Sequence, residues 1–135
     1  MSQENVEIVR RALAAWNSRD IPGALALLDP EGEYINAPTA VEPGTRRGHD
    51  EIVGVFRKQW EIMPDAEVEI DQLHDRGDEV ISLTRMSRAM PGSDARINTP
   101  ALTSWRIRDG KVTRVEQLGV GPDFARALEA AGLSE

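Results

Sequence analysis

Apolar residues recur every three or four positions near the N-terminus, which is the spacing of one face of an α-helix. The residues on that face are Val6, Val9, Leu13 and Trp16. A short second helix is expected after Asp20, because aspartate suits the N-cap and Pro22 suits the first turn. The same periodicity predicts a third helix over residues 49–63 and a fourth from Phe124 to Gly132.

Alternation of apolar and polar residues predicts strands in most of the remaining chain. Five are expected, over residues 33–37, 66–74, 79–90, 96–108 and 111–118. Asp109-Gly110 favours a type I′ hairpin turn between the last two, because that turn needs positive φ at both central residues. Pro100 indicates that its strand lies at an edge or contains a bulge. Residues 38–48 hold two prolines and two glycines and are expected to form a loop.

The order of these elements predicts the fold class. Helices and strands do not alternate regularly, which favours an α+β domain with one antiparallel sheet and its helices on one face. The length of 135 residues suits a single domain over residues 1–135. The other face of the sheet would then be open.

Composition excludes several classes of protein and site. The absence of cysteine rules out a disulfide scaffold, a thiolate metal site and a cysteine nucleophile. A net charge of -7 without a basic block argues against nucleic acid and anionic membranes as partners. No apolar run approaches the roughly 18 residues of a membrane span. We therefore expect a cytoplasmic protein.

No cofactor is expected either. The histidines, His49 and His74, lack the spacing of a metal site, and Gly119-x-Gly121 lacks the further glycine and second strand–helix unit of a phosphate-binding loop. The sequence thus predicts no metal, nucleotide or redox group.

Five stretches of the chain are similar to the common sequence of one family. They are ENVEIVR at 4–10, ALLDP at 26–30, RGHDEI at 47–52, WRIRDGKV at 105–112 and ALEAAGL at 127–133. Together they resemble SnoaL-like domains of the nuclear transport factor 2-like superfamily. The resemblance implies a curved sheet wrapped around the long N-terminal helix, a cone of the cystatin-like α+β barrel type. It also implies a homodimer, since members commonly pair through the outer face of the sheet.

The family includes polyketide cyclases, ketosteroid isomerases, limonene epoxide hydrolases and proteins that only bind. Tyr34-Ile35-Asn36 is similar to the Tyr-x-Asn stretch that helps to hold water in the epoxide hydrolases. Arg85 aligns with their arginine, but Ser87 and Gln117 stand where they carry aspartates. Without a carboxylate base, epoxide hydrolysis is not expected. Arg85 would instead hold an anionic or carbonyl-bearing ligand.

Alternation and the resemblance together place the candidate site in the cone. Five polar side chains are expected to converge there: Tyr34, Asn36, Arg85, Ser87 and Gln117. The predicted apolar walls are Trp16, Phe56, Trp60, Met63 and Trp105. If the site is catalytic, Tyr34, Asn36 and Arg85 carry the chemistry.

Structural interpretations of the same polar residues stay open. Tyr34 and Asn36 also suit a half-buried strand and its end. Arg85 also suits the outer face of the sheet, facing solvent or paired with a structural carboxylate such as Glu116. If Gln117 points inward, alternation turns Glu116 outward.

Three functions fit these observations. The first is binding of a small apolar ligand, carbonyl-bearing or anionic, in the cone. The second is a metal-independent isomerase, cyclase or hydrolase that acts on a small cyclic apolar substrate. The third is a dimeric interaction module without a ligand, for which the cone would be filled by side chains.

Overall fold

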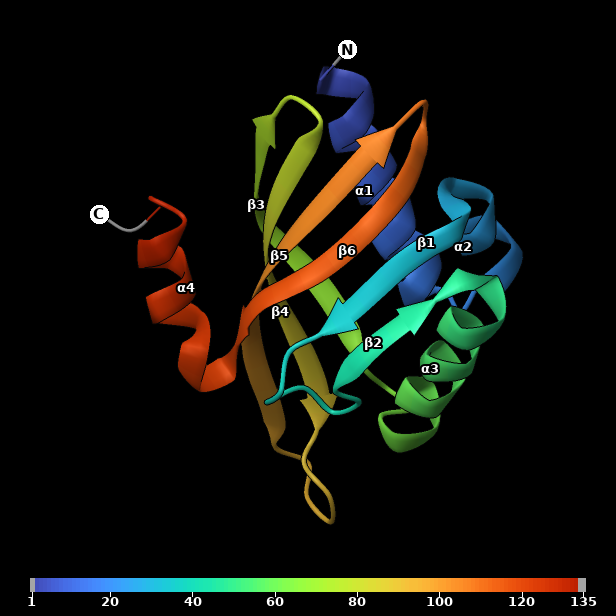
Figure 1. Ribbon diagram of the computed structural model, residues 1–135. Coiled ribbons are helices and arrows are strands. Elements are labelled where there is room, and N and C mark those ends of the chain that lie inside the picture. The colour runs from blue at the N-terminus through green and yellow to red at the C-terminus, as the bar shows by residue number, and fades with distance from the viewer. Residues whose placement is uncertain (1, 134–135) are drawn as a thin grey trace.

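The computed structural model describes residues 2–133 and shows helices packed on both sides of one curved sheet (Figure 1). The helices are α1 (Ser2–Asn17), α2 (Ile21–Leu27), α3 (Gly48–Ile62) and α4 (Phe124–Ala130), with a 3₁₀ turn η1 (Gly121–Asp123) before α4. The strands are β1 (Leu28–Asn36), β2 (Gly44–Arg47), β3 (Glu67–Arg76), β4 (Glu79–Ala89), β5 (Arg96–Arg108) and β6 (Lys111–Val120). The mixture of helices and one sheet is the predicted α+β class.

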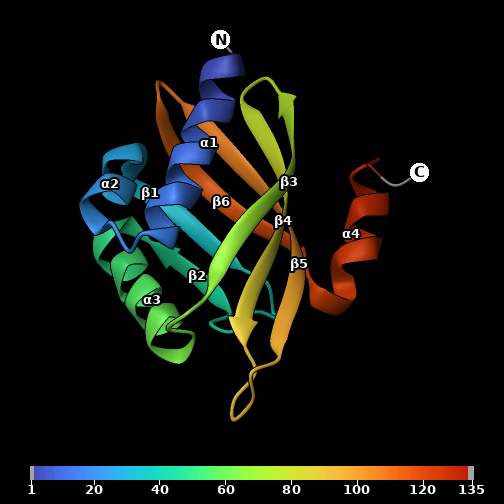
Figure 2. The ribbon, with the colours of Figure 1, turned by 180° about the vertical axis from the view of Figure 1, so that it is seen from behind.

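Helix α1 lies across the concave face of the sheet, where Figure 2 shows it in front of the strands. Val9 and Trp16 on its apolar face are buried, as the periodicity predicts. Val9 packs in the main core with Ile52 of α3 and with Val80, Trp105 and other strand residues. Asp20 caps α2 by accepting a hydrogen bond from the Gly23 N–H, 3.0 Å away. These helices form the wall opposite the concave side of the sheet.

The sheet is mixed and unclosed, with strand order β2-β1-β6-β5-β4-β3. The prediction of an all-antiparallel sheet is wrong at one place, because β1 and β6 pair in parallel. The predicted loop at 38–48 also contains β2, which pairs with β1. Four residues without an apolar alternation gave no strand signal there.

The turn between β5 and β6 has the backbone conformation that the sequence predicts. Asp109 and Gly110 both have positive φ, 52° and 76°, as a type I′ hairpin requires. Strand β5 is internal to the sheet, but it pairs with β6 only from Ala101 onward. Pro100 precedes that residue. The missing N–H of Pro100 therefore lies where β5 is paired only with β4.

Helix α4 packs on the outer face of the sheet, so the prediction that all helices gather on one face is wrong (Figure 1). Phe124 and Leu128 of this segment cover Ile81, Leu83 and Leu102. A Cβ at Gly119 would lie 2.5 Å from the Ala127 Cβ, so glycine permits this close approach. The outer face is not fully open, and the homodimer stays a prediction.

None of the helices within residues 2–133 is long and apolar enough to cross a bilayer.

Candidate functional site

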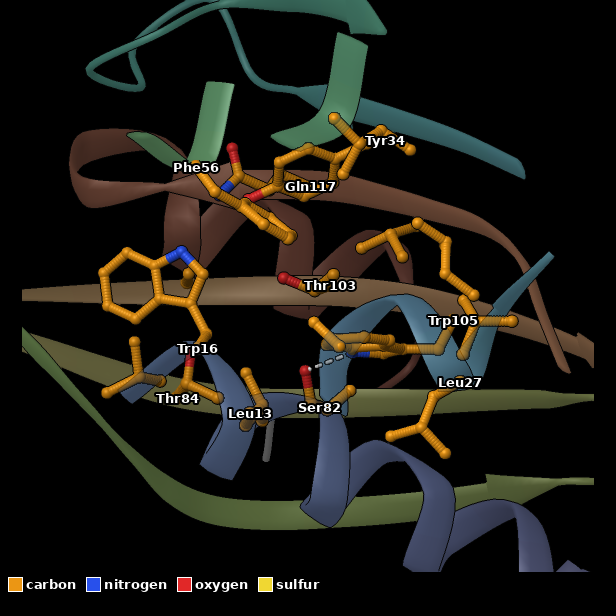
Figure 3. A pocket seen from close by; sticks show the side chains of 18 of the residues that line it. Leu13, Trp16, Leu27, Tyr34, Phe56, Ser82, Thr84, Thr103, Trp105 and Gln117 are labelled. Carbon is orange, nitrogen blue, oxygen red and sulfur yellow. Dashed lines mark hydrogen bonds between the residues drawn. The ribbon is translucent and has the colours of Figure 1, made fainter. Parts of the chain in front are cut away.

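A cavity of about 130 Å³ lies between the concave face of the sheet and helices α1, α2 and α3 (Figure 3). Its apolar wall comes from all of these elements: Ala12, Leu13, Trp16, Ala24, Leu27, Leu28, Ile52, Phe56, Val68, Met86, Ala101, Trp105, Val112 and Val115. Its polar groups come from β1, α3 and the long strands: Tyr34, Gln59, Ser82, Thr84, Thr103 and Gln117. No charged side chain belongs to this lining within the described part of the chain.

A hydrogen-bonded relay runs along one side of the cavity from Trp16 through Gln59 to Tyr34. The Trp16 Nε1–H donates to Gln59 Oε1 at 3.0 Å, and Gln59 Nε2 donates to the Tyr34 hydroxyl oxygen at 3.4 Å. An indole N–H can only donate, so it fixes which end of the Gln59 amide faces Tyr34. The Tyr34 oxygen therefore accepts, and its own proton has no acceptor among residues 2–133.

Burial raises the pKa of the Tyr34 phenol, and this effect exceeds the opposing effects of Gln59 and Arg46. Tyr34 is thus a neutral hydrogen-bond donor across the physiological pH range. Its ring packs edge-on against Phe56, with 5.6 Å between centroids, which holds the hydroxyl in place.

A second tryptophan makes the same kind of contact on strands β4 and β5. The Trp105 Nε1–H donates to Ser82 Oγ at 2.8 Å (Figure 3). Ser82 is 0% exposed, toward the cavity as well as toward bulk solvent. Ser82 therefore belongs to the packed wall of the cavity, and its hydroxyl is not open to a ligand.

Three further polar side chains line the sheet side of the cavity. Gln117 accepts the Ala37 N–H through Oε1 at 2.9 Å, which leaves its Nε2 free to donate. The Thr84 and Thr103 hydroxyls have no protein partner within residues 2–133, and neither is sealed from the cavity. Thr103 pairs across strands with both Ser82 and Gln117, so these groups form one polar strip.

The predicted place of Arg85 and Ser87 in the cavity is wrong. Arg85 points from the outer face of β4 and forms a two-pronged ion pair with Asp71, with Nε 2.9 Å from Oδ2 and Nη2 2.8 Å from Oδ1. Its Nη2 also lies 3.2 Å from Glu69 Oε2. Ser87 accepts from Arg96 on that same face.

The error about Arg85 has a physical cause in strand β4. Arg85 does share a face with buried Leu83, as alternation requires, but α4 buries that face from outside. Residues 80–84 are buried on both faces, so burial alone did not reveal which face is concave. Arg85 holds the pKa of the Asp71 carboxyl below its usual range through the hydrogen bonds between them.

Three other predicted site residues lie behind the cavity wall or beside it. Asn36 is buried on β1 and donates to the Glu42 carbonyl oxygen at 2.8 Å. Trp60 packs against Trp16 and Phe56, with centroids 5.9 and 5.8 Å apart, and Met63 packs against Trp16. None of the three belongs to the lining, so they support the wall rather than face a ligand.

The structure places the remaining five candidates in the lining, namely Trp16, Tyr34, Phe56, Trp105 and Gln117. Glu116 points outward as expected and lies 3.4 Å from Arg114 Nη2. Sequence reasoning missed Gln59, although a polar residue at 59 interrupts the apolar face of Ile52, Phe56 and Met63. This interruption of the apolar face is the feature of the sequence that could have identified Gln59.

Among the described side chains, no group of three His, Asp or Glu is placed to hold a metal ion. His49 has a structural contact, because its Nε2 lies 2.9 Å from the Leu28 carbonyl oxygen.

Comparisons with known proteins identify the family and the fold. The family model of the SnoaL-like domain matches residues 9–115. An NTF2-like protein from Burkholderia thailandensis E264 is 28% identical, with a TM-score of 0.76 and 96% of each chain covered. TerC co-crystallized with polyporic acid is 23% identical, with a TM-score of 0.75, covering 84% of this chain and 89% of that one.

A protein of ketosteroid isomerase-like fold from Catenulispora acidiphila, in complex with trimethylamine, is 22% identical, with a TM-score of 0.74, covering 95% of this chain and 94% of that one. The search of curated proteins gave no match. At these identities TerC and the Catenulispora protein show the fold alone. The family model covers most of the chain, and the chain therefore belongs to the SnoaL-like domain family.

Proposed function

We propose that the protein binds a small, neutral, mainly apolar molecule with a carbonyl group in the concave cavity. The observation that carries this proposal is a cavity with no charged side chain in its described lining and with a Tyr34 hydroxyl proton that has no acceptor among residues 2–133. A carbonyl oxygen accepts such a proton, and the apolar walls favour the rest of the molecule through burial of apolar surface.

The size of the cavity limits the ligand to about one ring. Its volume of about 130 Å³ is close to the roughly 150 Å³ of an apolar protein cavity that binds benzene. A cavity of this size also argues against a dimeric interaction module without a ligand, because that alternative requires a cone filled by side chains. TerC with polyporic acid and the Catenulispora protein with trimethylamine show other members of this fold holding organic molecules.

The anionic ligand of the sequence prediction loses its support. That prediction depended on Arg85, which lies on the outer face with Asp71. An anion in a cavity without a cation would lose its hydration without a paired charge, which is strongly unfavourable.

The enzyme alternative has weaker support than binding. An isomerase, cyclase or hydrolase needs a group that takes a proton near neutral pH. Tyr34 is the acid–base group of the described lining, and its raised pKa keeps it protonated. It can polarise a carbonyl but does not act as a base.

The proposal is tested by titrating the protein with cyclohexanone and recording the amide and indole N–H signals by NMR. The chain has three tryptophans, of which Trp16 and Trp105 line the cavity and Trp60 does not. We expect saturable shifts that are larger for the indoles of Trp16 and Trp105 than for that of Trp60. Shifts that do not saturate, or that avoid both lining indoles, would contradict the proposal.

Tyr34→Phe tests the hydrogen bond to the carbonyl. We expect it to weaken cyclohexanone about fivefold, because one neutral hydrogen bond contributes about 1 kcal/mol. Methylcyclohexane has the same ring without an acceptor and serves as the control, since its affinity should stay unchanged in the variant. Equal loss for both ligands would mean that the substitution damages the cavity instead.

A further inference from the structure

The Tyr34 hydroxyl is held in the hydrogen-bonding role that suits a phenol least. A phenol is a strong donor and a weak acceptor, because its oxygen shares a lone pair with the ring. In this cavity, however, its oxygen accepts from Gln59 Nε2 at 3.4 Å, and its proton has no acceptor among residues 2–133. An unpaired donor in an apolar cavity is unfavourable, so a neighbouring group must impose this arrangement.

The indole of Trp16 imposes it through the Gln59 amide. Gln59 is 5% exposed, so water outside the protein does not compete for its side chain. The Trp16 Nε1–H donates to Gln59 Oε1 at 3.0 Å, and an indole N–H can only donate. The amide therefore cannot turn over without setting its own NH₂ group against the indole N–H, donor against donor.

Trp16 is itself fixed by its surroundings. Its ring packs on that of Trp60, with 5.9 Å between centroids, and the Arg19 guanidinium lies 5.2 Å from its centroid. Arg19 is anchored in turn, since it donates to the carbonyl oxygens of Ala66 at 3.1 Å and Pro64 at 2.8 Å. The packing of the fold thus sets the direction of the indole N–H before any ligand binds.

Tyr34 is the end of this relay that meets a ligand. Trp16 and Gln59 are buried, whereas Tyr34 is half-buried and lines the cavity (Figure 3). A ligand atom with a lone pair gains a hydrogen bond from the Tyr34 proton. A ligand N–H at the same place would oppose that proton, and the oxygen behind it is already engaged by Gln59.

We propose that Trp16 is the positioning residue that makes the cavity select ring compounds whose polar atom accepts a hydrogen bond over those whose polar atom donates one. It acts through Gln59 on Tyr34 and does not need to touch the polar atom of the ligand. This inference rests on the proposed function and adds what fixes its preference for a carbonyl. The preference is then reversible, because without the indole N–H the Gln59 amide can turn over and accept the Tyr34 proton.

The experiment measures the dissociation constants of cyclohexanone, which only accepts, and pyrrole, whose ring N–H only donates. Their ratio is compared between the native protein and Trp16→Phe, so that differences in the hydration of the free ligands cancel. The ratio should shift against cyclohexanone by about fivefold or more, since cyclohexanone loses one hydrogen bond and pyrrole gains an acceptor. Methylcyclohexane, which has no polar atom, reports any change in the cavity that affects all rings. An unchanged ratio would overturn the inference.

Trp60→Phe is the matched control, because it makes the same substitution in the ring that packs on Trp16. The Trp60 Nε1 is buried without a hydrogen-bond partner among the described residues, so this variant removes ring volume but no hydrogen bond. It should leave the ratio unchanged. A shift as large as that of Trp16→Phe would mean that ring packing sets the preference, which contradicts the inference.

The Tyr34→Phe background shows whether the effect passes through the hydroxyl. In that background Trp16→Phe should no longer shift the ratio, because there is no hydroxyl whose direction can change. Equal shifts with and without the hydroxyl would show that Trp16 acts on the ligand by another route, and the inference would be wrong.

Gln59→Glu tests the same relay with almost no change in volume, and it decides the question if Trp16→Phe does not fold. At a pH that ionises the new carboxyl, this group has no proton to donate, so it accepts from both Trp16 and Tyr34. The ratio should again shift against cyclohexanone, and by more with the Tyr34 hydroxyl than in the Tyr34→Phe background. The same ratio in both backgrounds would overturn the inference.

The outcomes separate this inference from the proposed function. If neither cyclohexanone nor methylcyclohexane binds in the cavity, the proposed function fails and this inference fails with it. If both bind and the ratio of cyclohexanone to pyrrole is the same in the native protein, Trp16→Phe and Gln59→Glu, the cavity binds ring compounds as proposed and only this inference fails.

Discussion

Strand β4 contributes to both faces of the sheet, and its two faces are buried in different ways. Ser82, Thr84 and Met86 face a cavity between the sheet and three helices. Ile81 and Leu83 face outward and pack against α4. The comparison shows that a curved sheet can bury one face under a packed helix and still line a cavity with the other.

Charged side chains are also distributed unevenly between the two faces of the sheet. The outer face carries ion pairs between Arg85 and Asp71 and between Arg114 and Glu33, all of which reach solvent. The concave face carries neutral hydroxyl and amide groups. Charged groups tolerate the outer face because water remains near them, whereas a lone charge in the cavity would lose its hydration. The difference makes the inner face suited to ligands and the outer face to structure.

The largest effect should come from the outer apolar cluster. Leu102 is fully buried under α4, so Leu102→Ala leaves a void and should lower the free energy of unfolding by about 2–5 kcal/mol. Urea denaturation measures this loss. Cyclohexanone binding at a temperature where the variant is folded should stay unchanged, because Leu102 does not line the cavity. A loss below about 1 kcal/mol would mean that α4 packs loosely.

A smaller effect with the opposite sign is expected on the inner face. The Thr103 hydroxyl has no protein partner among the described residues, so Thr103→Val replaces it by a methyl group of the same shape. We expect the free energy of unfolding to stay equal or to rise by up to about 1 kcal/mol. Thermal and urea unfolding measure the change. Clear destabilisation would show that this hydroxyl has a structural role and weaken the contrast between the two faces.

Much of the fold follows from local chemistry in the sequence. The helical periodicity at Val9 and Trp16, the cap at Asp20 and the Asp109-Gly110 turn act over a few residues, so they were predictable. The parallel pairing of β1 with β6 and the presence of β2 depend on which strands meet across the chain. No local pattern records those contacts.

The site was less predictable, because it depends on which face of each strand is concave. Alternation correctly grouped Arg85 with Leu83, but only the position of α4 shows that this face is the outer one. Gln59 was missed for a related reason, since its importance lies in linking Trp16 to Tyr34, which are distant in the chain.

The smallest effect should come from Arg85→Met, although the sequence pattern made Arg85 the main ligand contact. Its ion pair with Asp71 is exposed, so the variant should lose little stability and bind cyclohexanone as the native protein does. Arg85 lowers the pKa of the Asp71 carboxyl, so the pair stabilises the fold above the unfolded pKa of about 3.9. That contribution is lost as the pH falls through the lower pKa of the folded state. Any stability difference between variant and native protein should therefore be seen at neutral pH and shrink in acid. Urea denaturation at both pH values checks this, and a cyclohexanone affinity that falls with Arg85→Met would show that the outer face does contribute to ligand binding.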